Sequence, residues 1–172
     1  LLCHDESQTW TPAAAGNETF PINCMSWYLA YAFCAWDRGR LPTEAEWELA
    51  ARAGDGRATY RGNLDDSEPE FDTWTCAVNV ELEPIAWYCG NSATIQPVGG
   101  KEPNDWGLRD VAGNVWEMCE GRWLEDSLPM RGGCFLGSAT FVRVTCRWTP
   151  EDPVNGAHWM GFRCLKEIPT QQ

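Results

Sequence analysis

The chain has few of the residues on which metal sites usually draw. Its 172 residues include only two histidines, His4 and His158, and none of its nine cysteines belongs to a Cys-x-x-Cys pair. Structural zinc sites need four cysteine or histidine ligands at short, regular spacings. The sequence therefore predicts no zinc site, and it excludes a site built on three histidines of this chain.

Positive charge and long apolar runs are also scarce. Thirteen Lys and Arg residues stand against 25 Asp and Glu residues, which gives a formal net charge of −12. This balance disfavours nucleic acid and anionic membranes as partners, because both are themselves negative. No apolar run reaches the length of a membrane span, so we expect no membrane insertion. No segment has the charged start, apolar run and cleavage site of a signal peptide.

The cysteines are numerous but scattered. Scattered cysteines without metal-ligand spacing are typical of disulfides and of an oxidising compartment, so we expect an extracytoplasmic or secreted protein. Buried, reduced thiols in a cytosolic protein are the alternative. Nearness in sequence suggests three pairs, although spacing does not determine connectivity: Cys3–Cys24, Cys76–Cys89 and Cys119–Cys134. Cys34, Cys146 and Cys164 are then left over.

Two helices and two strands follow from the periodicity. Ser26 is suited to cap a helix over residues 27–36, and because that helix is apolar on nearly every side we expect it to be buried. Thr43 and Glu46 form a capping box ahead of a second helix over residues 44–52. Apolar and polar residues alternate over 142–148 and over 161–165, which predicts two short strands.

Helices followed by short antiparallel strands amid long loops predict an α+β fold with little regular structure. The length suits one domain with a real core, and we place that domain over residues 1–172. Proline, glycine and asparagine residues predict that residues 1–22 are an irregular N-terminal segment.

Four segments stand out in this order along the chain: residues 26–36, residues 39–48 with the run RLPTEAEWE, residues 107–117 with the run GNVWE, and the motifs at 131–133 and 161–164. Together they resemble the formylglycine-generating-enzyme (sulfatase-modifying factor) family. The matching region spans residues 23–165. The resemblance implies a loop-rich variant of the C-type-lectin-like fold, and it implies that the family's N-terminal strands are absent from this chain.

The resemblance also bears on activity. The oxidases of the family hold copper with two cysteines a few positions after the Gly-Gly pair, and other members hold iron with three histidines. Here the two cysteine positions fall on Gly137 and Val142, neither of which binds copper. We therefore expect no catalytic residues, no copper and no iron. An oxidoreductase with a displaced or incomplete site, built on Cys134 and Cys146, is the alternative.

A structural calcium ion is the metal that the resemblance implies. The implied ligands are the carboxylates of Asp110 and Glu117 and the backbone carbonyls of Gly113 and Val115. Hard oxygen ligands of this kind suit calcium. The alternative is that the aspartate caps a turn and that the glutamate pairs with an arginine such as Arg109 or Arg131.

Two further pairs complete the expected site residues. The resemblance implies a disulfide between Cys34 and Cys164. Trp148 and Trp159 flank a turn rich in proline and glycine and suggest a ligand platform, with core packing as the alternative. Taken together, these features predict a calcium-stabilised, lectin-like binding module whose partner is an unidentified protein, peptide or carbohydrate.

Overall fold

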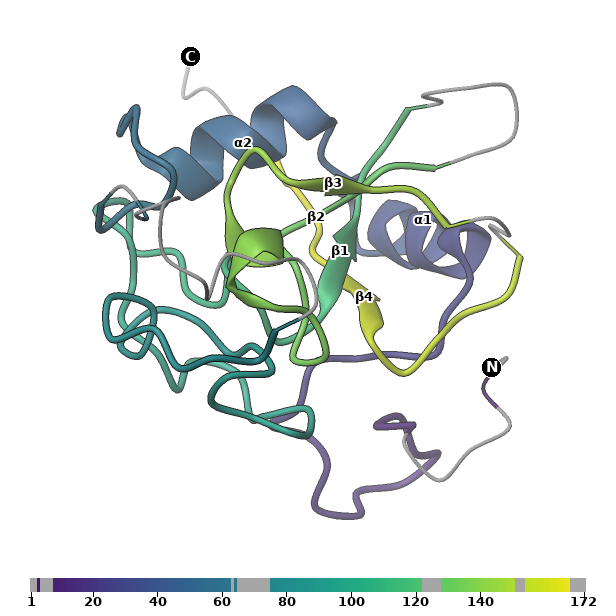
Figure 1. Ribbon diagram of the computed structural model, residues 1–172. Coiled ribbons are helices and arrows are strands. Elements are labelled where there is room, and N and C mark those ends of the chain that lie inside the picture. The colour runs from purple at the N-terminus through teal and green to yellow at the C-terminus, as the bar shows by residue number, and fades with distance from the viewer. Residues whose placement is uncertain are drawn as a thin grey trace.

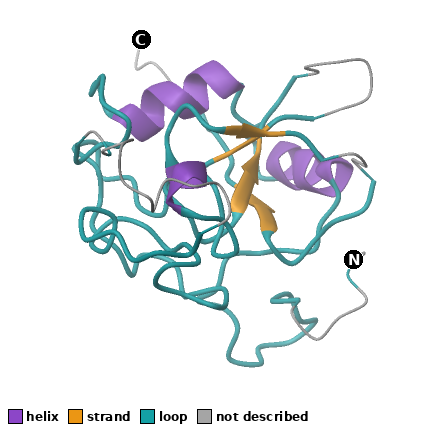
Figure 2. Ribbon diagram, viewed as in Figure 1, coloured by secondary structure: helices purple, strands orange, loops and turns teal. Residues whose placement is uncertain are grey.

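The computed structural model describes residues 3, 8–62, 64, 75–121, 128–150 and 154–167. The helices are α1 (Trp27–Trp36) and α2 (Glu44–Arg52), and η2 (Ala139–Val142) is a short 3-10 helix. Four short strands are β1 (Trp116–Met118), β2 (Met130–Arg131), β3 (Arg147–Trp148) and β4 (Met160–Phe162). Figure 1 shows α1 and α2 near one end of the molecule with the strands between them. Most of the ribbon in Figure 2 is loop, and the predicted loop-rich α+β class is confirmed.

The second helix starts as its capping box predicts. The backbone N–H of Glu46 donates to the Thr43 hydroxyl, and the backbone N–H of Thr43 donates to the Glu46 carboxylate at 2.9 Å. The Arg40 guanidinium also donates to that carboxylate, and together with the cap it lowers the pKa of Glu46 to about 2. The helix then turns Trp47 and Ala51 toward the core.

The first helix forms over the predicted residues, but the expectation that it is buried is wrong. Its buried residues are Ala30 and Cys34. Its large side chains are exposed: Tyr28, Leu29, Tyr31, Phe33 and Trp36. The sequence pattern reports which residues are apolar and not which of them the rest of the chain covers. Within the described residues, neither this helix nor any other is long and apolar enough to cross a membrane.

The strands form one sheet in the order β3-β2-β1-β4. The β1–β2 and β2–β3 pairs are antiparallel, whereas β1 runs parallel to β4, so the expectation of antiparallel strands is wrong at this pair. The predicted strand over 142–148 is wrong for most of its length, because Val142 ends η2 and only residues 147–148 pair with β2. The predicted strand over 161–165 ends earlier, and Leu165 instead forms an isolated bridge with Arg40.

Two apolar clusters fill the interior. The first lies under α2 and combines Trp47 of that helix with Val142 of η2 and with loop residues such as Tyr88. The second joins α1 to the sheet and includes Trp116 and Met160. The sheet therefore separates two small cores rather than covering a single large one.

A fully buried arginine links these elements. Arg131 of β2 forms an ion pair with Glu48 of α2 and donates at 3.0 Å to the backbone carbonyls of Thr145 and Cys146. Its guanidinium also lies 5.7 Å from the centre of the Trp47 ring. A cation buried to this degree is stable only with such partners, so the residue ties α2 to two neighbouring segments.

Three disulfides connect distant parts of the chain. Cys34 is joined to Cys164, as the resemblance implied, and the other two bonds are pairs that sequence proximity suggested, Cys3–Cys24 and Cys76–Cys89. The suggested Cys119–Cys134 bond is wrong, because both thiols are free. The physical reason is their location, since the first belongs to the cluster under α2 and the second to the cluster of α1.

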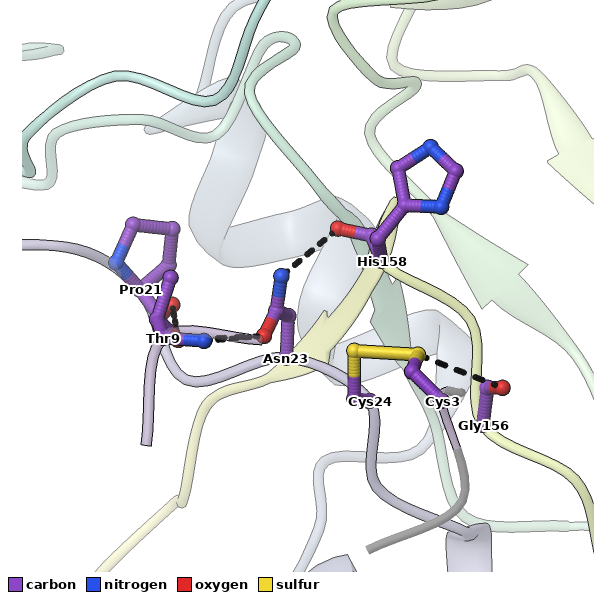
Figure 3. Close-up of a disulfide and its surroundings, with 7 residues drawn as sticks. All are labelled: Cys3, Thr9, Pro21, Asn23, Cys24, Gly156 and His158. Carbon is purple, nitrogen blue, oxygen red and sulfur yellow. Dashed lines mark hydrogen bonds between the residues drawn. A yellow bond between two sulfur atoms is a disulfide. The ribbon is translucent and has the colours of Figure 1, made fainter. Parts of the chain in front are cut away.

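The N-terminal segment is irregular but anchored. Residues 8–22 contain no helix or strand, and residues 1–2 and 4–7 lie outside the described part of the chain. Figure 3 shows Asn23 beside the Cys3–Cys24 disulfide. The buried Asn23 side chain accepts a hydrogen bond from the Thr9 backbone N–H at 2.8 Å and donates to the His158 carbonyl at 2.9 Å. One asparagine thus holds this segment to the loop before β4.

Candidate ligand pocket

Aromatic side chains from four separate segments meet around one pocket of about 230 Å³. They come from β1, η2, β3 and the residue before β4: Trp116, Phe141, Trp148 and Trp159. Cys134, Leu136 and Gly137 complete the lining. We call this the aromatic pocket. Both tryptophans that the sequence singled out as a platform lie in it, while Trp116 and Phe141 were not expected there.

Three of these rings hold one another in place. The Trp116 and Phe141 ring centres are 6.2 Å apart, those of Phe141 and Trp148 6.1 Å, and both pairs pack edge to face. The Trp116 and Trp148 centres are 6.3 Å apart. Trp116 is 4% exposed, whereas Trp148 is 43% exposed. Edge-to-face packing is the geometry that aromatic pairs prefer, so the pocket has a fixed floor and an accessible rim.

The lining of the aromatic pocket is uncharged. Its residues are tryptophan, phenylalanine, leucine, cysteine and glycine. An anion entering this pocket would lose its hydration without gaining a counter-charge, which is strongly unfavourable. The lining is chemically suited to an uncharged, apolar group.

The two positions implied for copper ligands fall in different environments. Gly137 lies in the wall of the aromatic pocket, and a Cβ at this position would come within 3.2 Å of the Phe141 ring. Val142 is fully buried in the cluster under α2. The missing side chain of Gly137 therefore leaves space that Phe141 and the pocket occupy.

The displaced thiol pair lies in apolar surroundings. Cys134 lines the aromatic pocket and belongs to the apolar cluster that joins α1 to the sheet. Cys146 packs against that cluster. Burial raises the pKa of both thiols. Among the described residues, no three or more His, Cys, Asp or Glu side chains are grouped so that they could hold a metal.

The carboxylate of Glu117 is buried and held by neighbouring side chains. It accepts a hydrogen bond from the Trp47 indole at 2.5 Å and forms an ion pair with Arg163. Glu117 does pair with an arginine, which was the alternative to calcium binding, but the arginine is Arg163 and not Arg109 or Arg131. A calcium ion at this carboxylate would have to compete with the guanidinium.

Asp110 differs from Glu117 in one respect that favours a cation. Its Oδ2 accepts a hydrogen bond from the Gly99 backbone N–H at 2.6 Å, but its Oδ1 is buried and accepts none. Burial raises the pKa of this carboxyl group. Gly113 has a φ of 79°, and a Cβ there would overlap the Trp87 backbone, so this position requires glycine. Asp110 thus fits a calcium ligand, whereas Glu117 in this arrangement does not.

A wider groove of about 760 Å³ runs along α2. Its charged side chains are paired with one another: Glu44 lies 3.0 Å from Arg147, and Glu48 lies 2.8 Å from Arg52. The ion pairs within the groove compensate its charges, so they leave little for a ligand to neutralise. The smaller aromatic pocket is the better candidate site, because a ligand would remove its exposed apolar surface from water.

Comparison with known sequences places these observations in a family. The sequence model described as "Sulfatase-modifying factor enzyme 1-like domain" matches residues 3–168. The formylglycine-generating enzyme of Thermomonospora curvata is 34% identical over 173 residues, which cover 86% of this chain and 55% of the relative. The Bos taurus protein named inactive C-alpha-formylglycine-generating enzyme 2 is 34% identical over 154 residues, which cover 84% and 50%. The chain spans about half the length of these curated relatives.

Solved structures with the same fold include two that cover most of the chain. Treponema denticola variable protein 1 superimposes with a TM-score of 0.69 at 25% identity, over 90% of this chain and 74% of its own. PvdO from Pseudomonas aeruginosa gives a TM-score of 0.65 at 22% identity, over 84% and 60%. The arrangement of helices, sheet and long loops is therefore one that other proteins share.

Proposed function

The chain belongs to the sulfatase-modifying factor family, and we propose that it acts there as a binding module rather than as a copper-dependent oxidase. The observation that carries this proposal is the aromatic pocket, in which a glycine stands at one of the implied copper positions. The other position, Val142, is buried in a different cluster. The inactive Bos taurus relative supports the same reading, since it shows that family members without the activity exist.

We infer that the ligand inserts one uncharged, apolar group into the aromatic pocket. The pocket measures about 230 Å³, whereas sites for drug-sized molecules span roughly 300–1,000 Å³. It therefore suits a single ring or branched side chain. A carbohydrate needs several fixed polar partners, which this lining does not supply. Of the expected ligand classes, the apolar side chain of a peptide or protein fits best.

Truncation of the exposed pocket tryptophan tests this proposal. We expect indole to bind the protein and Trp148→Ala to weaken that binding at least tenfold, because the variant removes a pocket wall; tenfold corresponds to about 1.4 kcal/mol. The measurement is a ligand-observed NMR titration. Trp106→Ala is the matched control, since Trp106 is 55% exposed and lies outside the lining.

Two other probes separate the ligand classes. Methyl α-glucoside represents a carbohydrate, and tetramethylammonium represents a cation of similar bulk to a branched side chain. We expect neither to saturate the pocket. If either binds in a Trp148-dependent way while indole does not, the inferred ligand class is wrong.

We also propose calcium as a structural ion at Asp110, with the carbonyls of Gly113 and Val115 as further ligands. The buried, unpaired Oδ1 of Asp110 supports it. Glu117 would complete the set only after exchanging its Arg163 partner. When bound, the ion would neutralise a carboxylate that is otherwise buried with one oxygen unsatisfied.

Asp110→Asn is expected to raise the melting temperature in the absence of calcium and to reduce the stabilisation that calcium provides. In EDTA the variant should melt higher than the parent at pH 7, because burial raises the pKa of Asp110 and so penalises its charged form in the folded state. That penalty is present above the raised pKa and disappears as the pH falls below the normal aspartate pKa, so the gain should vanish near pH 3. With calcium, the variant should gain less stability than the parent.

The control for this prediction is Asp105→Asn, which changes an exposed carboxylate in the same loop region. It should alter neither the EDTA melting temperature nor the calcium response. If calcium raises the melting temperature of the parent and of Asp110→Asn equally, Asp110 is not a calcium ligand.

The alternative function is an oxidoreductase with a displaced site, and the resemblance to the Thermomonospora curvata enzyme favours it. Elemental analysis of protein purified without chelator distinguishes the two functions. Calcium near one per chain would support the binding module. Stoichiometric copper or iron would support the oxidoreductase and direct mutagenesis to Cys134 and Cys146.

The three disulfides point to an oxidising, extracytoplasmic compartment. We propose secretion or surface exposure as the specific location. A binding module in that compartment would meet its protein or peptide partner outside the cytosol.

A further inference from the structure

A second pocket, of about 340 Å³, lies within the irregular N-terminal segment. All the residues that line it fall in the range 9–22, and none of them also lines the aromatic pocket. We call it the N-terminal pocket. In Figure 1 this part of the chain, drawn in purple, lies on the side of the molecule away from α2. A ligand bound here would occupy a site distinct from the aromatic pocket.

Hydrogen bonds hold the walls of the N-terminal pocket in place. The Thr9 hydroxyl donates to the Pro21 carbonyl at 2.8 Å, and the Thr9 backbone N–H donates to the Asn23 side chain (Figure 3). The Val98 backbone N–H donates to the Thr19 carbonyl at 2.7 Å, which ties the segment to the body of the protein. The pocket therefore has a defined shape before any ligand binds, although no helix or strand forms it.

The lining combines two aromatic rings with one carboxylate. The rings are those of Trp10 and Phe20, and Glu18 is the only charged residue among those that line the pocket. Trp10 is 44% exposed, and Glu18 is also exposed, so solvent reaches both side chains. Aromatic faces attract organic cations through their electron-rich centres, and carboxylates attract them through charge-assisted hydrogen bonds. The lining is thus suited to a positively charged organic group.

The carboxylate of Glu18 is positioned by the backbone but not neutralised. Its Oε1 accepts a hydrogen bond from the Ala15 backbone N–H at 2.7 Å, and nearby backbone N–H groups, its own first, lower its pKa. Within the described part of the chain, Glu18 takes part in no ion pair. The sequence accounts for this, because Arg38 is the first Lys or Arg along the chain. The pocket therefore presents a negative charge that a ligand can compensate.

We propose that the N-terminal pocket binds the guanidinium group of an arginine side chain that a partner protein or peptide presents. A guanidinium is planar, so one of its faces can lie on an aromatic ring while its edge donates hydrogen bonds to a carboxylate. The ammonium group of lysine is a more strongly hydrated point charge and gains less from the rings. The net charge of −12 favours a basic partner over an acidic one.

Other occupants fit this pocket less well. An anion would be repelled by the carboxylate of Glu18, and a purely apolar group would cover that charge without pairing it. A calcium ion needs six to eight oxygen ligands, whereas the lining offers one carboxylate. The described residues also contain no group of three or more His, Cys, Asp or Glu side chains placed to hold a metal. An organic cation is the class that uses both the rings and the charge.

NMR titration of the 172-residue chain with N-acetyl-arginine amide tests the proposal. We expect saturable binding in the millimolar range, as is typical of a single small group at an open site. N-acetyl-citrulline amide is the matched neutral probe, because it has nearly the same shape without the positive charge. It should bind at least about fivefold more weakly, since it loses both the ion pair and the cation–π attraction.

Two variants locate the binding. Glu18→Gln keeps an oxygen that can accept from the Ala15 backbone N–H but removes the charge, and it should weaken arginine binding about fivefold. Trp10→Ala should weaken it about threefold, the effect of one exposed cation–π contact. Glu81→Gln and Trp106→Ala are the matched controls, because both residues are exposed and lie outside the lining. All four variants should keep the melting temperature of the parent.

Three results would overturn the proposal. The first is equal binding of the arginine and citrulline probes, and the second is unchanged arginine binding in Glu18→Gln. The third is arginine binding that Trp148→Ala abolishes while Glu18→Gln and Trp10→Ala retain it, which would assign the probe to the aromatic pocket. The inference does not depend on the ligand proposed for that pocket. A failure of indole to bind would leave it standing, and a failure of the arginine probe would leave the indole result unaffected.

Discussion

Replacing Cys34 with alanine is expected to lower the free energy of unfolding by roughly 3–5 kcal/mol. The reason is the length of chain that the bond closes, since Cys34 and Cys164 are 130 residues apart. In the chain-entropy model, a longer closed loop removes more freedom from the unfolded state. The bond also fixes the buried side of α1 beside the end of β4. The measurement is equilibrium unfolding in guanidinium chloride.

Two comparisons check the origin of this loss. Cys164→Ala should produce the same loss, and the double variant should lose no more than either single variant, because all three remove the same bond. The Cys76–Cys89 bond spans only 13 residues, so removing both of its cysteines should lower the stability by less. If the short bond proves the more important, loop length is not what determines the contribution.

Arg131→Met should lower the free energy of unfolding by roughly 3–5 kcal/mol, the range for breaking one side of a buried ion pair. Arg131 is fully buried, and its loss would leave Glu48 with the less buried Arg52 as its remaining ion-pair partner. The backbone carbonyls of Thr145 and Cys146 would lose their donor at the same time. Methionine fills much of the volume, so the loss would report the unpaired polar groups rather than a cavity.

Arg147→Met is the matched control for this prediction. Arg147 also pairs with an acidic residue of α2, Glu44, but its side chain is 44% exposed. Exposed ion pairs contribute about 0–1 kcal/mol, so this variant should remain close to the parent. Adding Glu48→Gln to Arg131→Met should restore part of the stability, because it removes a carboxylate that has lost its buried partner and keeps only Arg52. No recovery would mean that packing, and not charge, explains the loss.

The sequence predicts those parts of the fold that local signals specify. The capping box around Thr43 places α2 correctly, because its hydrogen bonds lie within four residues. The strands β1 and β2 escape prediction, since strands of three and two residues are too short to show a period of two. Their pairing depends on partners far away in the chain, which no local pattern records.

At the candidate site, too, local sequence signals predict some residues, whereas contacts between distant segments are missed. Composition and position identify Trp148 and Trp159, but not Trp116 and Phe141, because only the fold brings β1 and η2 to the same pocket. The partner of Glu117 is also non-local, since Arg163 is 46 residues away. Sequence reasoning found the residue types at the site and missed the contacts that decide their chemistry.

The parallel pairing of β1 with β4 has a consequence for how the chain folds. Its partners, such as Trp116 and Met160, are far apart in sequence, and the ladder is only three residue pairs long. Contacts of this kind stabilise the chain only after a long loop has closed, and closing that loop costs conformational entropy. Proteins that depend on such contacts therefore fold slowly. We expect the Cys3–Cys24 and Cys76–Cys89 bonds to form early and the Cys34–Cys164 bond to form last. Until then Cys119, Cys134 and Cys146 are open to mispairing, so oxidative refolding should be the slowest and least efficient step in producing the protein.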